Sequence, residues 1–167
     1  MLQIFQLQLL VYFSFIKFKI SFAKVLFIYF AIIKNKYFMR HFINIAILLC
    51  LTSIILGAFG AHLLKEILTE FQLSSFETGV RFQMFHGLSI LILSLNKKYF
   101  NNKLKFALMI MSLGTIIFSL SIYLLNIQEY LNIKLSFLGP ITPVGGLLII
   151  ISWLILLFIV KTKDTYN

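Results

Sequence analysis

The chain has 167 residues, of which 60% are hydrophobic and 12% are charged, and its mean hydropathy is +0.99. Soluble domains are about 45–50% apolar, so this composition excludes a soluble globular domain, and it also excludes a disordered chain, which is poor in hydrophobic residues. The net charge is +10. The basic residues bracket long apolar runs and form no aromatic-and-basic face, so we expect them to set membrane topology and expect no nucleic-acid partner. The sequence predicts an integral membrane protein whose surroundings are a lipid bilayer.

The first 38 residues differ from the rest of the chain. They contain no acidic residue, glycine or proline, and Lys17, Lys19 and Lys24 divide them into apolar runs too short to span a bilayer. We expect this extension to be translated upstream sequence ahead of a start at Met39. The alternative is an interfacial helix, because Ser14, Lys17, Ser21 and Lys24 share one helical face.

Four later runs have the length and composition of spanning helices: residues 42–61, 75–95, 105–126 and 143–160. A span needs about 20 residues, because the hydrocarbon layer is about 30 Å thick and a helix rises 1.5 Å per residue. The fold class expected is therefore all-α, an integral membrane four-helix bundle over residues 39–160, followed by a cytoplasmic tail of residues 161–167.

The ends of these helices carry recognisable signals. Ser74 and Glu77 have the spacing of a capping box, which predicts that the second helix begins at about residue 75. Thr142 and Pro143 resemble the N-cap and first residue of the fourth helix. Between the first two helices we expect a short interfacial amphipathic segment, residues 63–73, with its apolar side formed by Leu64, Ile67, Leu68 and Phe71.

The basic residues predict the orientation. Nine of them fall on one side of the expected bundle and three on the other, which places both termini in the cytoplasm and the protein in the cell inner membrane. The nine are Lys34, Lys36, Arg40, Lys97, Lys98, Lys103, Lys105, Lys161 and Lys163, and the three are Lys65, Arg81 and Lys134. The single cysteine, Cys50, excludes an intrachain disulfide.

Small side chains recur along the expected helices. We interpret Gly57, Gly60, Gly145 and Gly146 as helix-packing residues, because in lipid the close approach of two backbones drives helix association. A channel lining is the alternative interpretation of the same positions.

Four motifs give the chain a family resemblance. They are GAFGAH at residues 57–62, FETGVRFQMFH at 76–86, FSLSIY at 118–123 and GPITPVGG at 139–146. In this order they resemble the bacterial membrane-protein family called domain of unknown function 423, whose animal relatives are named transmembrane protein 256. The likeness covers residues 39–160. Leu120 and Ser152 stand where the family usually or often has glycine. The resemblance implies four spanning helices that begin near Met39, and it implies no activity.

Polar side chains within the expected spans are the candidate functional residues, because ionisable groups at membrane depth are costly and often functional. We expect Glu77 and Arg81 to pair in the first two turns of their helix. We expect Gln83 and His86 to face the bundle, where His86 is either a neutral hydrogen-bonded histidine or part of a proton relay or ligand site. The full candidate set is His62, Glu77, Arg81, Gln83, His86 and Tyr123.

No catalytic, metal or cofactor site is expected. His62 and His86 could suggest bis-histidine haem, but they differ in depth by about 16 Å along the helix axis. No Cys/His cluster, phosphate loop or nucleophile–base spacing is present in the sequence. We therefore expect a non-enzymatic structural or accessory membrane factor, and leave a homo-oligomer open. The alternative is a small-molecule or proton-coupled passage or binding protein with its site around His86 and Arg81.

Overall fold

The computed structural model describes residues 39–160, which lie in one compact unit. The expected N-terminal extension, residues 1–38, and the tail, residues 161–167, lie outside the described residues. The described part contains a first helix at residues 39–61, then α2 (Glu70–Leu95), α3 (Leu104–Ile127) and α4 (Ile141–Ile159). Four helical segments in it are long and apolar enough to cross a membrane. The predicted all-α, four-helix membrane fold is confirmed.

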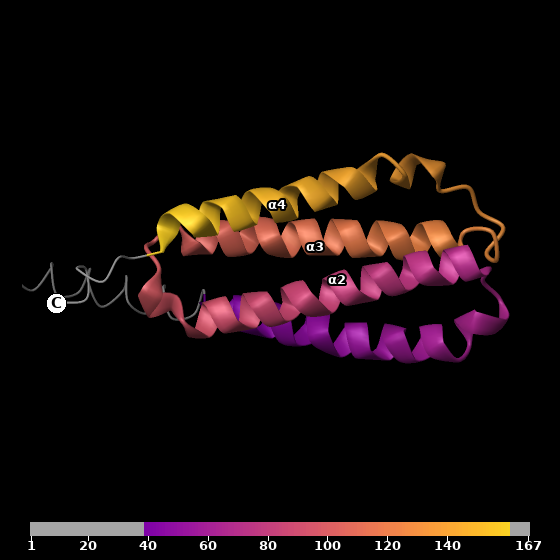
Figure 1. The fold of residues 1–167 in the computed structure, drawn as a ribbon, viewed down its shortest axis with the longest axis horizontal. Coiled ribbons are helices and arrows are strands. Elements are labelled where there is room, and N and C mark those ends of the chain that lie inside the picture. The colour runs from indigo at the N-terminus through magenta and orange to yellow at the C-terminus, as the bar shows by residue number, and fades with distance from the viewer. Residues whose placement is uncertain (1–38, 161–167) are drawn as a thin grey trace, which may run out of the picture. The chain divides into compact units, whose positions relative to one another are not determined.

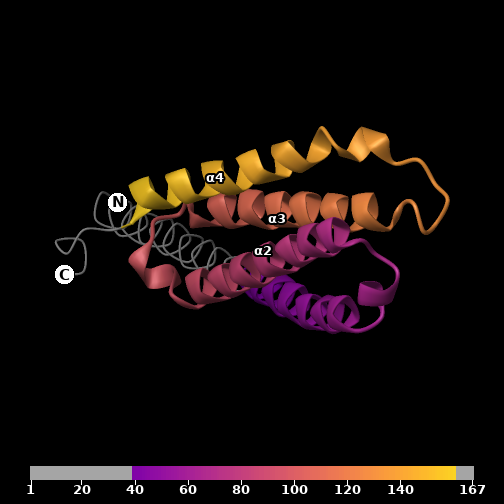
Figure 2. The same ribbon diagram turned by 45° about the vertical axis from the view of Figure 1, so that its right-hand side comes forward.

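Each helix packs against the next one along the chain (Figures 1 and 2). α3 has α2 on one side and α4 on the other. The Ser53 hydroxyl of the first helix donates to the Val80 carbonyl of α2 over 3.0 Å, so the first helix lies against α2. Short turns of 3₁₀ helix join the long helices: η1 (Leu64–Glu66), η2 (Lys97–Tyr99) and η3 (Ser136–Leu138).

The apolar core is concentrated at one end of the bundle. All four helices contribute to it: Met39, Phe42, Ala46, Leu49, Ile90, Leu104, Ala107, Leu108, Met111, Leu156 and Ile159. At this end the Asn101 amide donates to the Ile159 carbonyl over 3.2 Å, which ties the α2–α3 connection to the end of α4. We call it the lysine-rich end, because Lys97, Lys98 and Lys103 lie in that connection. Burial lowers the pKa of Lys97, and the nearby charge of Lys105 lowers it further.

α2 begins five residues earlier than the sequence analysis predicts, and the predicted capping box at Ser74 and Glu77 is wrong. The N-cap is Thr69, whose hydroxyl accepts from the Gln72 amide over 3.3 Å while the Gln72 side chain accepts from the Thr69 amide over 3.0 Å. Residues 69–72 match the same capping pattern as residues 74–77, and the earlier match starts the helix. The predicted amphipathic segment is therefore divided between η1 and the first turn of α2.

α4 also begins earlier than predicted. Its N-cap is Pro140, so Thr142 and Pro143 lie inside the first turn and the predicted cap at Thr142 is wrong. The Thr142 hydroxyl instead donates to the Leu138 carbonyl over 3.2 Å and shares a 2.8 Å hydrogen bond with Ser121 of α3. α3 has the predicted limits to within one residue at each end.

α3 and α4 approach each other closely at two glycines. A methyl group built on Gly145 would lie 2.5 Å from the Phe118 amide nitrogen, and one built on Gly114 would lie 2.9 Å from the Gly145 carbonyl oxygen. Only a residue without a side chain allows these backbones to approach so closely. Gly57, Gly60 and Gly146 have room for a methyl group, with nearest atoms at 3.4, 3.6 and 3.7 Å.

Candidate functional site

A buried polar cluster links three helices near the middle of the bundle. The Gln83 side chain of α2 donates from Nε2 to the Leu49 carbonyl over 2.9 Å and to the Thr52 hydroxyl over 2.6 Å. Its Oε1 accepts a 2.9 Å hydrogen bond from the Tyr123 hydroxyl of α3. We call Gln83, Thr52, Tyr123 and the Leu49 carbonyl the Gln83 cluster. Gln83 and Tyr123, two of the candidate residues, are thus brought into direct contact.

Both donors of the Gln83 amide are used inside this cluster, and the carbonyl oxygen has a partner as well. One turn away, the Ser119 hydroxyl of α3 donates to the Gly79 carbonyl of α2 over 3.0 Å. Buried polar groups with satisfied hydrogen bonds fix one arrangement of the helices. This arrangement holds the three helices together by hydrogen bonds, and the Gln83 amide has no donor left for a ligand.

His86 is buried beside the Gln83 cluster, with 9% of its surface exposed. Its Nδ1 lies 2.8 Å from the Phe82 carbonyl oxygen of its own helix. A carbonyl can only accept, so Nδ1 carries a hydrogen. The centroid of the imidazole lies 5.7 Å from that of the Phe82 ring, in a stacked arrangement, and 6.4 Å from that of the Trp153 ring of α4, in a T-shaped arrangement. His86 therefore faces the bundle among aromatic rings.

Glu77 and Arg81 lie on a different side of α2. They form the predicted i,i+4 ion pair, with 3.6 Å between Arg81 Nη1 and Glu77 Oε2, and about half of each side chain is exposed. Arg81 also donates from Nη2 to the Thr78 hydroxyl over 3.0 Å. Because α2 begins at Glu70, Arg81 lies eleven residues into the helix, and the predicted position in its first two turns is wrong. Arg81 and His86 are not brought into one site.

His62 does not belong to the buried part of the bundle. It is exposed, in the turn that follows the first helix. His86 lies in the buried interior of α2. Within residues 39–160, no group of three or more His, Cys, Asp or Glu side chains is arranged to hold a metal ion.

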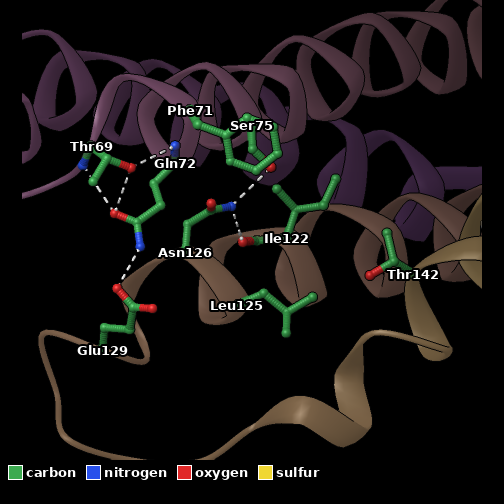
Figure 3. Close-up of a pocket in the computed structure, with 9 residues that line it drawn as sticks. All are labelled: Thr69, Phe71, Gln72, Ser75, Ile122, Leu125, Asn126, Glu129 and Thr142. Carbon is green, nitrogen blue, oxygen red and sulfur yellow. Dashed lines mark hydrogen bonds between the residues drawn. The ribbon is translucent and has the colours of Figure 1, made fainter.

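A pocket of about 660 Å³ opens at the end of the bundle opposite the lysine-rich end (Figure 3). We call this end the pocket end. The pocket is formed where α2 begins, α3 ends and α4 begins, and its lining residues are Thr69, Phe71, Gln72, Ser75, Ile122, Leu125, Asn126, Glu129 and Thr142. Sequence reasoning missed it, because these residues come from three segments and each is ordinary for a helix end.

Hydrogen bonds hold the polar wall of the pocket in place. Gln72 donates from Nε2 to Glu129 Oε2 over 2.9 Å, and Asn126 donates to the Ser75 hydroxyl over 3.1 Å (Figure 3). Glu129 supplies the one charge among the residues that line the pocket. Its second carboxylate oxygen points away from Gln72 in the close-up. The pocket is therefore an acceptor-rich, negatively charged cavity beside apolar side chains.

Leu120 and Ser152, the two positions where the family usually or often has glycine, occupy different environments. Leu120 points outward from α3 with 51% of its surface exposed, so its bulk does not separate the described helices. Ser152 is fully buried in α4, where its hydroxyl donates to the Ile149 carbonyl over 2.7 Å.

Comparison with known proteins places the chain among membrane proteins without an assigned activity. A UPF0382 membrane protein of Staphylococcus haemolyticus is 36% identical over 71% of this chain and 93% of its own length. The UPF0382 membrane protein YwdK of Bacillus subtilis is 33% identical over 71% of this chain and 94% of its own. A UPF0382 membrane protein of the yeast Schizosaccharomyces pombe is 35% identical over 66% of this chain and 92% of its own. No solved structure matches the chain.

The family described as "Protein of unknown function (DUF423)" matches residues 56–146. That range includes α2, α3, the Gln83 and Tyr123 positions and the whole pocket lining. With this match and these relatives, the chain is an integral membrane protein that belongs to the family of unknown function DUF423.

Proposed function

We propose that this protein is a non-enzymatic structural or accessory factor of the membrane. The observation that carries the proposal is the Gln83 cluster, in which the polar groups at mid-bundle satisfy one another across three helices. A transport or catalytic site needs polar groups that can exchange partners with a substrate, whereas a scaffold needs them engaged. The burial of His86 among aromatic rings supports the same function, because a proton relay needs access to water.

We also propose a membrane location and an orientation for the protein. The bacterial relatives are named membrane proteins, and we assign this chain to the cell inner membrane with both termini in the cytoplasm. The charge distribution supports that orientation, because Lys97, Lys98 and Lys103 share one end of the bundle.

Proton flux through reconstituted vesicles tests the proposal. The full-length protein is placed in liposomes that contain a pH-sensitive dye, and a pH step is applied with valinomycin and potassium to clamp the membrane potential. We expect the dye to respond no faster than in protein-free liposomes, for the wild type and for His86→Leu alike. Flux by the wild type that His86→Leu removes would contradict a structural role and establish the relay.

A second candidate function, binding of a small organic cation, is favoured by the pocket. Its volume of about 660 Å³ is in the range of ligand sites, and Glu129 gives it a negative charge beside Phe71, Ile122 and Leu125. An ammonium group would meet the carboxylate while an apolar group packed against those side chains. This site differs from the one around His86 and Arg81 that the sequence suggests.

Thermal unfolding with matched probes tests this second function. Benzylamine carries a positive charge at neutral pH, and benzyl alcohol has nearly the same shape without it. We expect benzylamine alone to raise the melting temperature of the purified full-length protein, because a ligand that binds only the folded state stabilises it. Glu129→Gln should remove the shift and Glu66→Gln, in the turn η1, should keep it. Equal shifts from both compounds would exclude a cation site.

A further inference from the structure

The pocket lies where the helices reach the membrane surface. α3 has 24 residues, which correspond to about 36 Å of helix, whereas the hydrocarbon layer of a bilayer is about 30 Å thick. Its ends therefore reach the headgroup region on both sides. Asn126 is the last residue but one of α3, Glu129 lies two residues beyond its end, and both line the pocket. The polar wall of the pocket is thus at the depth of lipid headgroups.

Exposed apolar side chains border the pocket on both connections at this end. Phe71, which lines the pocket, has 83% of its surface exposed. Tyr130 and Phe137, each 63% exposed, lie in the connection whose two ends, Glu129 and Thr142, also line the pocket. Exposed rings in a connection are unfavourable in water and favourable in the interfacial layer of a bilayer. Lipid therefore reaches the surface beside the pocket.

The polar wall of the pocket offers two oxygen atoms to a hydrogen-bond donor. Asn126 Nδ2 donates to the Ile122 carbonyl over 2.7 Å and to the Ser75 hydroxyl over 3.1 Å. Both amide hydrogens are therefore used, and Oδ1 is the atom of this side chain that can accept. Glu129 accepts from Gln72 at Oε2, and its Oε1 points away from that contact (Figure 3). A donor that enters the pocket can thus meet an amide oxygen and a carboxylate oxygen.

We propose that the pocket binds the headgroup of a phospholipid that carries a primary ammonium group. The lipid occupies the cation site of the second candidate function, on which this assignment rests. An ammonium group has three donors and one positive charge, which match Asn126 Oδ1, Glu129 Oε1 and the charge of Glu129. The acyl chains of the same molecule pack against Phe71 and the membrane-facing surface beside it. A soluble amine makes only the first set of contacts, so the lipid binds more tightly.

The lining of the pocket disfavours other common headgroups. A choline group has the same charge but no N–H donor, and proteins recognise it with several aromatic rings. Phe71 is the single aromatic residue among the described residues that line the pocket. The headgroup of phosphatidylglycerol has a net negative charge, which would lie beside Glu129, and none of the described lining residues is basic. The primary ammonium headgroup is therefore the one that fits.

Thermal unfolding of the full-length protein in detergent with added lipids tests this assignment. Dioleoylphosphatidylethanolamine and dioleoylphosphatidylcholine share acyl chains, phosphate and net charge, and differ only in methylation of the nitrogen. Both should raise the melting temperature if they bind the folded state. We expect phosphatidylethanolamine to act at a concentration at least about tenfold lower, because a hydrogen bond to a charged group contributes about that factor or more. Glycerophosphoethanolamine, the same headgroup without acyl chains, should need a higher concentration than the lipid.

Three variants locate the lipid on the protein. Glu129→Gln keeps an oxygen that can accept from Gln72 and removes the charge, so it should abolish the preference for phosphatidylethanolamine over phosphatidylcholine. Glu66→Gln removes the same charge in η1, outside the pocket, and should keep the preference. Phe71→Ser changes a side chain that is 83% exposed, so the fold should survive. It should weaken the response to the lipid and leave the response to glycerophosphoethanolamine unchanged.

Several results would overturn the assignment. Equal responses of the wild type to the two lipids would exclude recognition of the ammonium group, and a preference that Glu129→Gln retains would place the lipid elsewhere on the protein. Stabilisation by benzylamine without stabilisation by phosphatidylethanolamine would leave a pocket for soluble cations, so that the second candidate function stands and the lipid assignment fails. No response to either compound would refute both.

Discussion

The Tyr123 hydroxyl of α3 lies 2.9 Å from Gln83 Oε1 of α2 and donates a hydrogen bond to it in the buried part of the bundle. Tyr123 also packs its ring against Phe76, with 4.8 Å between the ring centroids. It further fills the space beside Gly79, where a methyl group would lie 2.8 Å from Tyr123 Cε1. One side chain thus combines apolar packing and a polar link between the same two helices.

Tyr123→Phe should isolate the polar link, because it removes the hydroxyl and keeps the ring. We expect a loss of about 1–2 kcal/mol in the free energy of unfolding, since Gln83 Oε1 would be left buried without its donor. Thermal unfolding in detergent measures the change. Tyr130→Phe, at a position with 63% of its surface exposed, is the control and should have no effect. Equal stability of the two variants would show that water replaces the hydroxyl.

Gly145→Ala should destabilise the protein far more than Gly146→Ala. The added methyl group at residue 145 would lie 2.5 Å from a backbone nitrogen of α3, which cannot move without displacing the helix, while at residue 146 it would lie 3.7 Å from a ring. Overpacking of this kind costs about 1–3 kcal/mol. The melting temperatures of the two variants, purified side by side, check the difference. A Gly146→Ala variant as unstable as Gly145→Ala would contradict the observed contact.

Ser94→Ala should stabilise the protein. The Ser94 hydroxyl oxygen is buried and has no hydrogen-bond partner among the described residues. Removing a buried unsatisfied group recovers its desolvation cost, so we expect a gain of up to about 1 kcal/mol. Ser112→Ala is the matched control, because its equally buried hydroxyl donates to the Leu108 carbonyl over 2.8 Å. The control should be neutral or destabilising, and a loss of stability in Ser94→Ala would imply a partner beyond residue 160 or before residue 39.

Accessibility of introduced cysteines should report the orientation. In a Cys50→Ala background we expect a cysteine at Asn101, at the lysine-rich end, to resist a membrane-impermeant maleimide added to intact cells. A cysteine at Tyr130, at the pocket end, should react. Permeabilised cells provide the control, in which both positions should react. Labelling at Asn101 alone would invert the proposed topology.

Much of the fold follows from the sequence because lipid leaves the backbone few choices. The limits of α3 are clear from an uncharged run bounded by Lys105 and Asn126, and the structure agrees to within one residue at each end. The start of α2 was not predictable in the same way, because residues 69–72 and 74–77 both match the capping pattern. The earlier cap gains a tertiary contact, Gln72 to Glu129, that no local pattern reveals.

The candidate site, too, could be predicted from the sequence only in part. Gln83 and Tyr123 could be selected individually, because polar side chains in an apolar span are conspicuous, but their pairing depends on how α2 and α3 are aligned. The glycines show a similar limit. The sequence identifies Gly145 as a packing residue, yet gives no reason to separate it from its neighbour Gly146 or to select Gly114 as its counterpart.

The polar N-terminal half of α2 has a consequence for the synthesis of the protein. α2 is the least hydropathic of the four spans, and Glu77 and Arg81 make it a weak signal for the translocon on its own. The first helix presents the Ser53 hydroxyl, the Thr52 hydroxyl and the Leu49 carbonyl to it. We therefore expect the first helix and α2 to pass from the translocon into lipid together as a hairpin, because hydrogen bonds to the first helix satisfy polar groups of α2.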